Sequence, residues 1–453
     1  MKGFVGRLLV LSLQCSLWGL LLLNLESSYS YAKINFEPPR IGEVLLAFLA
    51  LSFTAILLPA KLSSPSAATL WWLATFLVTS TLAVAIFNPA FSNATATSAS
   101  VAVILGFAIT AVMIRRNRPI RTFAYVNWIT PSNYARGIFA LTAVAIITVL
   151  VANPGGLNDF SLASSYDRRF ASRAVPDIVP LSRYLRSYLS PVFIPLTLML
   201  GLRNRKFSYL ALAVFAAVAV FEFDGQKSPL IAPILVAVML WAFAGESAPR
   251  NSTIFGVLLT SVFILVPIAI SIFLPQLYLD VYISRRMGLV PAILTNDYVN
   301  FSQTFGYTRF SQSWLQYFPN QDRTSAGIRV GSFQAPGSGQ NSNANLWADG
   351  FLSLGFLGVV IISLIFVFLL RFADRLAASR DFTWSCTALS VVFTAYSDGY
   401  LHTSFLSYGV VASLLLLWLH PKDKGVTGLP GDGQLDLSWD ANADHVHKNR
   451  LLR

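Results

Sequence analysis

The residues best suited to chemistry are arginines gathered in two long polar segments, roughly residues 153–188 and 275–350. The basic residues of these segments are all arginines: Arg168, Arg169, Arg173, Arg183, Arg186, Arg285, Arg286, Arg309, Arg323 and Arg329. A guanidinium group binds phosphate or carboxylate through two parallel hydrogen bonds and stays charged at physiological pH. Each arginine could instead be solvated or paired with an aspartate, but the two segments together predict binding of a lipid diphosphate or an acidic glycan.

Another basic residue, Lys227, lies in a polar turn, residues 224–227, between two apolar segments. This turn could be solvated, or it could line a site for a charged head group. The candidate diphosphate ligands are therefore Lys227 and six of the arginines, namely Arg168, Arg169, Arg173, Arg285, Arg286 and Arg309.

Two ionisable side chains beside apolar segments could move a proton. Asp349 follows Asn345 by four residues, so the two would share one face of a helix. His402 lies in the polar turn 398–403, and histidine titrates near neutral pH. Asp349 could instead interact with a helix dipole, and His402 could be incidental. Both are candidate catalytic residues, and the general base stays unassigned between them.

The elements that must position these residues are membrane helices. Hydrophobic residues make up 55% of the 453-residue chain and charged residues only 12%, whereas a soluble domain carries about 25% charged residues. The apolar runs are long enough to cross a roughly 30 Å hydrocarbon core as helices. The composition predicts an all-α polytopic membrane protein and excludes a soluble enzyme, a disordered chain and a barrel of short alternating strands.

We expect about twelve transmembrane helices in one integral domain, residues 1–421, followed by a disordered cytoplasmic tail, residues 422–453. The predicted spans are roughly 8–24, 43–60, 69–90, 99–114, 134–152, 189–202, 207–223, 229–245, 253–274, 351–370, 383–397 and 404–419. The first run follows Lys2 and Arg7 and is expected to be retained rather than cleaved. Basic residues in the short connections predict that both termini are cytoplasmic, so both Arg-rich segments become outer-face loops carrying short helices.

Several common sites have no signal in this sequence. The chain has no Asp-x-Asp pair for a metal-bound nucleotide sugar and no phosphate-binding loop of the Gly-x-x-x-x-Gly-Lys type. Cys15 and Cys386 both lie inside apolar runs, where they offer neither a disulfide framework nor metal-ligand spacing. We expect neither a metal nor a cofactor.

Two segments carry a resemblance to a known family. The first reads Asn345-Leu-Trp-Ala-Asp349-Gly-Phe-Leu-Ser-Leu-Gly355-Phe-Leu-Gly358, and the second reads Asp398-Gly-Tyr-Leu-His402-Thr-Ser. With the many spans and two Arg-rich outer loops, they make most of the chain similar to the bacterial O-antigen or oligosaccharide repeat-unit polymerases (Wzy type). Gly355 and Gly358 are expected to allow close backbone approach between helices.

The resemblance implies a metal-independent membrane glycosyltransferase of the GT-C superfamily in the bacterial inner membrane. Its substrates would be oligosaccharides on undecaprenyl diphosphate, and the loop arginines would hold the diphosphates. The growing chain would be transferred as a block to a new lipid-linked unit at the outer face, in O-antigen, capsule or exopolysaccharide synthesis. The lipid bilayer and a chain-length regulator protein are the candidate partners, and nucleic acid is excluded.

Two other classes stay open. O-antigen ligases usually carry a His-Asn pair before the Gly-x-x-Gly span, whereas Ala344-Asn345 stands here, which argues against a ligase without excluding another polyprenyl-linked GT-C enzyme. A lipid-glycan transporter would place polar residues near the bilayer midplane in repeated halves. The spans carry almost no central ionisable residue, and no internal repeat is visible.

Overall fold

The computed structural model describes residues 2–29, 34–115, 129–152, 168, 180–226, 228–243, 250–310, 324–337, 341–378 and 380–421. The described chain is almost wholly helical. The α-helices are α1 (Lys2–Tyr29), α2 (Ile41–Leu57), α3 (Pro65–Leu73), α4 (Thr79–Phe87), α5 (Asn93–Arg115), α6 (Pro131–Ala152), α8 (Pro180–Tyr188), α9 (Ile194–Asn204), α10 (Phe207–Asp224), α11 (Ser228–Phe243), α12 (Ser252–Thr260), α13 (Val266–Phe273), α14 (Val290–Phe305), α15 (Ala326–Gln334), α16 (Leu346–Ala378), α17 (Phe382–Phe393), α18 (Leu401–Leu406) and α19 (Val410–Trp418).

Shorter elements join these helices. Wider π-helical turns link helices into longer rods, namely η2 (Ala74–Val78), η3 (Leu189–Phe193) and η4 (Ser261–Leu265), and a longer one, η6 (Asp280–Leu289), leads into α14. Two 3-10 turns, η5 (Pro275–Leu277) and η8 (Thr394–Ser397), follow α13 and α17. Two strands of two residues, β1 (Lys61–Leu62) and β2 (Arg250–Asn251), pair antiparallel.

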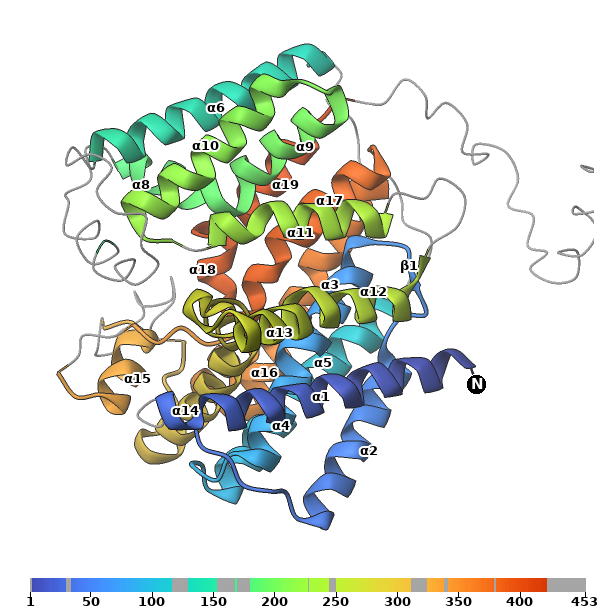
Figure 1. The fold of residues 1–453 in the computed structure, drawn as a ribbon, viewed down its shortest axis with the longest axis vertical. Helices are drawn as coiled ribbons and strands as arrows, with labels where there is room; N and C mark the ends of the chain where they lie inside the picture. The colour runs from blue at the N-terminus through green and yellow to red at the C-terminus, as the bar shows by residue number, and fades with distance from the viewer. Residues whose placement is uncertain are drawn as a thin grey trace, which may run out of the picture.

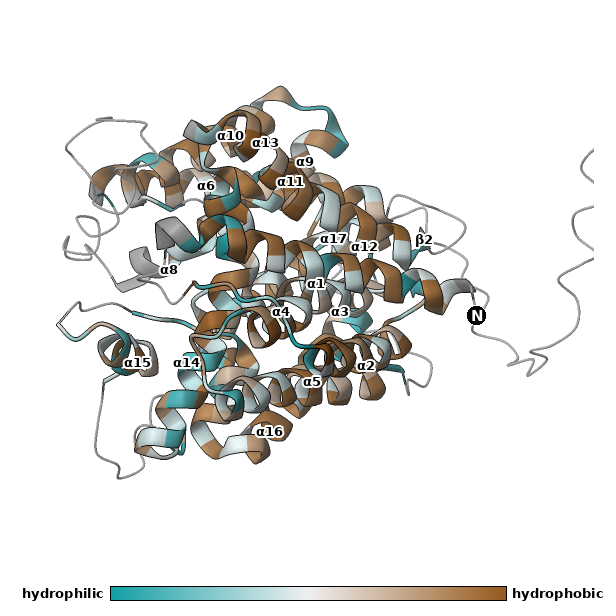
Figure 2. Cartoon of the chain, turned by 60° about the horizontal axis from the view of Figure 1, so that its bottom comes forward, coloured by the Kyte–Doolittle hydropathy of each residue, from teal (hydrophilic) through white to brown (hydrophobic). Residues whose placement is uncertain are grey.

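The predicted all-α membrane class is confirmed. Eight of the described helical rods are long and apolar enough to cross a membrane. Each of the twelve predicted spans falls on a helical segment, but α2, α10, α11 and α17 are shorter than the other rods. The number of crossings therefore stays a prediction. Large apolar side chains such as Leu46, Phe207 and Phe368 are about 70–80% exposed, as lipid-facing side chains are. Figure 2 shows that hydrophobic residues predominate along most of the helices.

Two groups of helices pack side by side (Figure 1). In one group α16 packs along α5 and α14, and α1 packs against α4 and α12. In the other group α10 packs against α6, α9 and α11. Helix α17 joins the groups because it contacts α11 on one side and α3 and α16 on the other.

Helix α16 is folded back on itself, which decides where Asp349 lies. Its path breaks at Leu354 and at Gly355, whose φ is 62°. The backbones on either side then touch, since a Cβ added to Gly358 would lie 1.9 Å from the Gly350 carbonyl oxygen. The Trp347 indole on the short arm donates to Ser363 Oγ on the long arm at 3.1 Å. The expected close backbone approach is found at Gly358, but it joins two arms of one helix rather than two helices, and Gly355 forms the turn between the arms.

Arginines hold the helices together at one end of the bundle. Arg7 donates to the Ala55 carbonyl at 2.8 Å, Arg115 to the Leu58 carbonyl at 2.6 Å, and Arg371 to the Met113 carbonyl at 2.6 Å. Each acceptor lies at a helix C-terminus, where unpaired carbonyls and the helix dipole attract a cation. The predicted orientation places all three arginines on the cytoplasmic side of the membrane. The candidate site lies at the opposite ends of α16 and α17.

Candidate functional site

The two candidate catalytic side chains, 53 positions apart in the sequence, lie together in the structure. His402 Nδ1, on α18, is 3.9 Å from Asp349 Oδ2 on the short arm of α16. The Asp349 side chain is 9% exposed and the imidazole 28% exposed. A carboxylate beside an imidazole can orient the ring and stabilise the imidazolium that forms when the other ring nitrogen takes a proton.

The short arm that carries Asp349 is fixed at both of its ends. Asn345 caps its N-terminus, because the Asn345 Oδ1 atom accepts from the backbone N–H groups of Trp347 at 2.9 Å and Ala348 at 3.0 Å. At the other end, Thr308 and Arg309 donate their backbone N–H groups to the carbonyls of Leu352 and Ser353. Asn345 is therefore a positioning residue for the arm.

Two buried tyrosines support His402. The rings of Tyr400 and His402 are stacked with centroids 5.6 Å apart and nearly parallel planes. The Tyr298 hydroxyl donates to the Ser342 carbonyl at 2.8 Å, and the Tyr400 hydroxyl is hydrogen-bonded to that of Tyr298. Burial raises the pKa of both phenols above their usual range, so both stay protonated. Since the Tyr298 proton goes to Ser342, Tyr400 is the donor to Tyr298.

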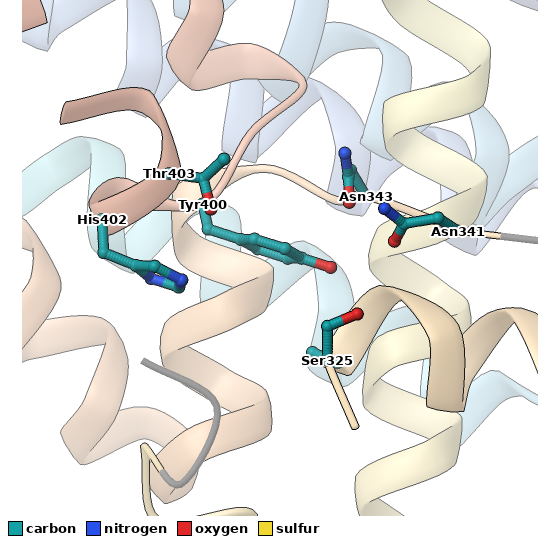
Figure 3. A pocket seen from close by; sticks show the side chains of 7 residues that line it. Ser325, Asn341, Asn343, Tyr400, His402 and Thr403 are labelled. Atoms are coloured by element: carbon teal, nitrogen blue, oxygen red, sulfur yellow. The ribbon is translucent and has the colours of Figure 1, made fainter. Parts of the chain in front are cut away.

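A cavity of about 150 Å³ opens beside this group (Figure 3). Its lining is mostly polar and comes from three segments: the start of α15, the loop before α16, and the start of α18. The lining residues are Ser325, Ala326, Asn341, Asn343, Tyr400, His402 and Thr403. Figure 3 shows the Tyr400 phenol extending toward Ser325 and the two asparagine amides.

One candidate diphosphate ligand lies next to the same turn. Arg286, on η6, forms an ion pair at 3.1 Å with Asp398, four residues before His402. Both side chains are partly exposed, so the guanidinium also reaches solvent. Arg285 beside it is half-buried. The turn between α17 and α18 thus joins the predicted proton-transfer residue to a predicted anion ligand.

For the other predicted ligands, no side-chain contact with Asp349 or His402 is described. Arg168 lies with its guanidinium 5.2 Å from the centre of the Phe221 ring on α10. Arg309 is exposed and has a left-handed backbone with φ 53°. Arg169, Arg173 and Lys227 lie outside the described residues, as do Arg323 and the C-terminal tail. The diphosphate assignment of these residues stays a prediction.

Several residues of this group were not singled out from the sequence. Tyr298 and Asn343 received no role from the sequence, and Tyr400 and Thr403 lie within the second motif, in which only His402 received one. Gly327 carried no signal, yet a Cβ there would lie 1.9 Å from Asn341 Oδ1 and 2.7 Å from the Tyr400 hydroxyl. Such tight placement could not be found without the fold.

The position where ligases carry histidine is apolar here. Ala344 is completely buried in a cluster with Leu294, Tyr298 and Leu352. Among the residues that the structure describes, no three His, Cys, Asp or Glu side chains form a group that could hold a metal ion. A scan of protein-family models and searches of curated proteins and of solved structures found no match to this chain.

Proposed function

We propose that this protein is a membrane glycosyltransferase that polymerises oligosaccharide repeat units carried on undecaprenyl diphosphate. The observation that carries the proposal is the pairing of His402 with Asp349 at the start of α16, with Arg286 beside the same turn. This group combines a proton acceptor with an anion ligand, and block transfer from a lipid diphosphate needs both.

In the proposed reaction His402 takes the proton of the acceptor sugar hydroxyl. The hydroxyl oxygen attacks the anomeric carbon of the growing chain, and the bond between that carbon and the diphosphate oxygen breaks. Asp349 stabilises the imidazolium, and undecaprenyl diphosphate leaves with its negative charge. A general base in such a position contributes roughly 10²–10⁴-fold to the rate.

Arginines stabilise the charge that develops on the leaving diphosphate. Arg286 is linked to the His402 turn by its ion pair with Asp398, and Arg168 and Arg285 are further candidates from the predicted outer loops. Preorganised guanidinium groups in a site with little water lower the energy of such a transition state more strongly than they would in bulk water.

The proposed topology has twelve crossings, with both termini cytoplasmic. It is supported by contacts at a shared end, where the start of α17 meets the end of α9 through Asp381 and Arg203, and the end of α11 through Thr383 and Phe243. The start of α3 meets the end of α16 there through Ser66 and Asp374. In this topology the His402 group faces the outer side of the inner membrane.

The test is polymerisation by the purified protein in proteoliposomes. The substrate is an undecaprenyl-diphosphate-linked repeat unit, supplied without nucleotide sugar or ATP. A gel ladder spaced by whole repeats is expected, and free undecaprenyl diphosphate should appear in proportion to the linkages formed. Single-sugar additions, or transfer to a lipid A core, would overturn the polymerase in favour of another GT-C enzyme or a ligase. Vesicle flux of intact substrate without new linkages would favour a transporter.

A further inference from the structure

We infer that the cavity between α15 and α18 is a subsite for one uncharged pyranose ring, the sugar whose hydroxyl faces His402. The chemistry of the lining carries this inference. The assignment of the ring as the acceptor rests on the proposed function, whereas binding of a neutral sugar does not.

The lining offers both hydrogen-bond donors and hydrogen-bond acceptors in a small space. Asn341 and Asn343 each supply a carbonyl acceptor and an amide donor, and Ser325 and Thr403 supply hydroxyls. Within the described part of the chain, the side chains of Asn341 and Thr403 make no hydrogen bond. A sugar ring carries hydroxyls that both donate and accept, so it matches such a set.

Tyr400 presents an acceptor to the cavity. Its hydroxyl proton is used toward Tyr298, which in turn donates to the Ser342 carbonyl. The remaining lone pair of the Tyr400 oxygen can therefore accept from a ligand hydroxyl. The phenol ring, stacked on the imidazole of His402, adds an apolar edge of the kind that packs against the C–H groups of a pyranose.

The lining contains no side chain with a fixed charge among the described residues. Its members are amides, hydroxyls, one alanine and the imidazole of His402. A uronic acid would bury its carboxylate there without a guanidinium or ammonium partner, which is costly. The subsite therefore favours neutral hexoses and N-acetylhexosamines, and the arginines are left for the diphosphates.

The space is limited to about one ring. A volume of about 150 Å³ far exceeds the roughly 10–15 Å³ that one water molecule requires, but it does not hold a whole repeat unit. Gly327 lies behind the lining, and a Cβ there would collide with Asn341 Oδ1 and crowd the Tyr400 hydroxyl. Substitution at Gly327 would thus displace the Asn341 side chain from its place in the lining.

The experiment measures sugar binding directly, without turnover. The protein in detergent micelles is mixed with millimolar glucose, galactose, N-acetylglucosamine, N-acetylgalactosamine or glucuronic acid, and saturation-transfer NMR detects bound ligand. At least one neutral sugar should bind more tightly than glucuronic acid. Asn341→Ala and Thr403→Val should each weaken that binding about three- to tenfold, as expected for the loss of one hydrogen bond.

Matched controls are Asn93→Ala and Thr304→Val, which change exposed residues at the start of α5 and on α14. Both should bind the sugar as the unchanged protein does. A second measurement tests whether the variants are folded: each variant must keep the elution volume and thermal midpoint of the parent protein. The conservative variants Asn341→Gln and Thr403→Ser should retain part of the sugar binding.

The outcomes separate the two proposals. Sugar binding that depends on Asn341 and Thr403, without any polymer ladder, supports the subsite and overturns the polymerase. A ladder from a protein that binds no neutral sugar, or whose binding ignores both substitutions, overturns the subsite and leaves the polymerase standing. Preferential binding of glucuronic acid also overturns the uncharged subsite.

Discussion

At the scale of single residues, the pairing of Asp349 with His402 is the feature of the site that substitutions test most directly. The imidazole is the only partner in ion-pair range of the Asp349 carboxyl among the described residues. A carboxylate that acts only through an imidazole makes no further contribution to the reaction rate once that imidazole is removed. The two side chains should therefore behave as one unit in polymerisation.

We expect His402→Ala to lower the polymerisation rate by roughly 10²–10⁴-fold, the usual contribution of a general base. Asp349→Asn should lower it less, and the double variant should be no slower than His402→Ala alone. The measurement is the initial rate of ladder formation at saturating substrate. Glu37→Gln on the exposed loop before α2 and His447→Ala in the tail are the controls. Additive losses would show that the two residues act separately.

Substitution of Arg286 separates the effect of its charge on activity from any effect on the stability of the protein. Its ion pair with Asp398 is partly exposed, and such pairs contribute about 0–1 kcal/mol to stability. Arg286→Ala should leave the thermal midpoint nearly unchanged while lowering the polymerisation rate at least about tenfold, because a charge-assisted contact to diphosphate is lost. Arg286→Lys should restore only part of the activity.

The control for that prediction is Arg136→Ala, an exposed arginine on α6 outside both Arg-rich segments. It should retain full activity. Equal loss in both variants would point to a general effect of basic charge on membrane insertion rather than to a contact with the diphosphate.

At the scale of elements, the folded-back α16 is the device that positions Asp349. Gly355 has φ 62° and ψ −144°, a conformation that costs other residues on the order of 1–3 kcal/mol. A Cβ there would also lie 2.8 Å from the Tyr307 hydroxyl. The arm, its Asn345 cap and the backbone bonds from Thr308 and Arg309 depend on this one turn.

We therefore expect Gly355→Ala to lower the free energy of unfolding by about 1–3 kcal/mol and to reduce activity further, because Asp349 moves away from His402. Gly358→Ala should be at least as damaging, since its Cβ would overlap the Gly350 carbonyl. Thermal unfolding followed by tryptophan fluorescence checks both. Gly137→Ala, which meets open space on α6, is the control and should not destabilise. An unchanged midpoint in Gly355→Ala would mean that the turn is not strained.

At the scale of the whole molecule, the question is which end of the bundle faces outward. Carbonyl-capping arginines gather at one end and the His402 group lies at the other. The positive-inside rule assigns the arginine end to the cytoplasm. Four of the rods are short, so the number of crossings needs a direct test.

Cysteine labelling provides that test, because the native cysteines Cys15 and Cys386 are both buried. In a background with both changed to alanine, Glu37→Cys, Asn93→Cys and Gln303→Cys should react with an impermeant maleimide added to spheroplasts. Lys61→Cys, Arg136→Cys and Arg205→Cys should react only after the membrane is opened. A reversed pattern would place the His402 group on the cytoplasmic side and rule out the proposed reaction on the outer face.

The sequence alone determined the class of the protein and the position of most helices. Long apolar runs can satisfy their backbone only as helices in lipid, so each of the twelve predicted spans falls on helical structure. One local signal was also reliable: Gly358 was expected to permit close backbone approach, and it lies against the Gly350 backbone.

Tertiary structure alone decided which polar residues meet. The side chains of Asp349, His402, Tyr298, Tyr400 and Asn341 come from three stretches of the chain, around residues 298, 341–349 and 400–402, and no periodicity relates stretches so far apart. The fold also gave Asn345 a capping role that its helical spacing from Asp349 did not suggest. The left-handed turn at Gly355 reversed the path of α16. Because a turn of this kind depends on the surrounding packing, hydrophobic patterning predicted the helix but not its reversal.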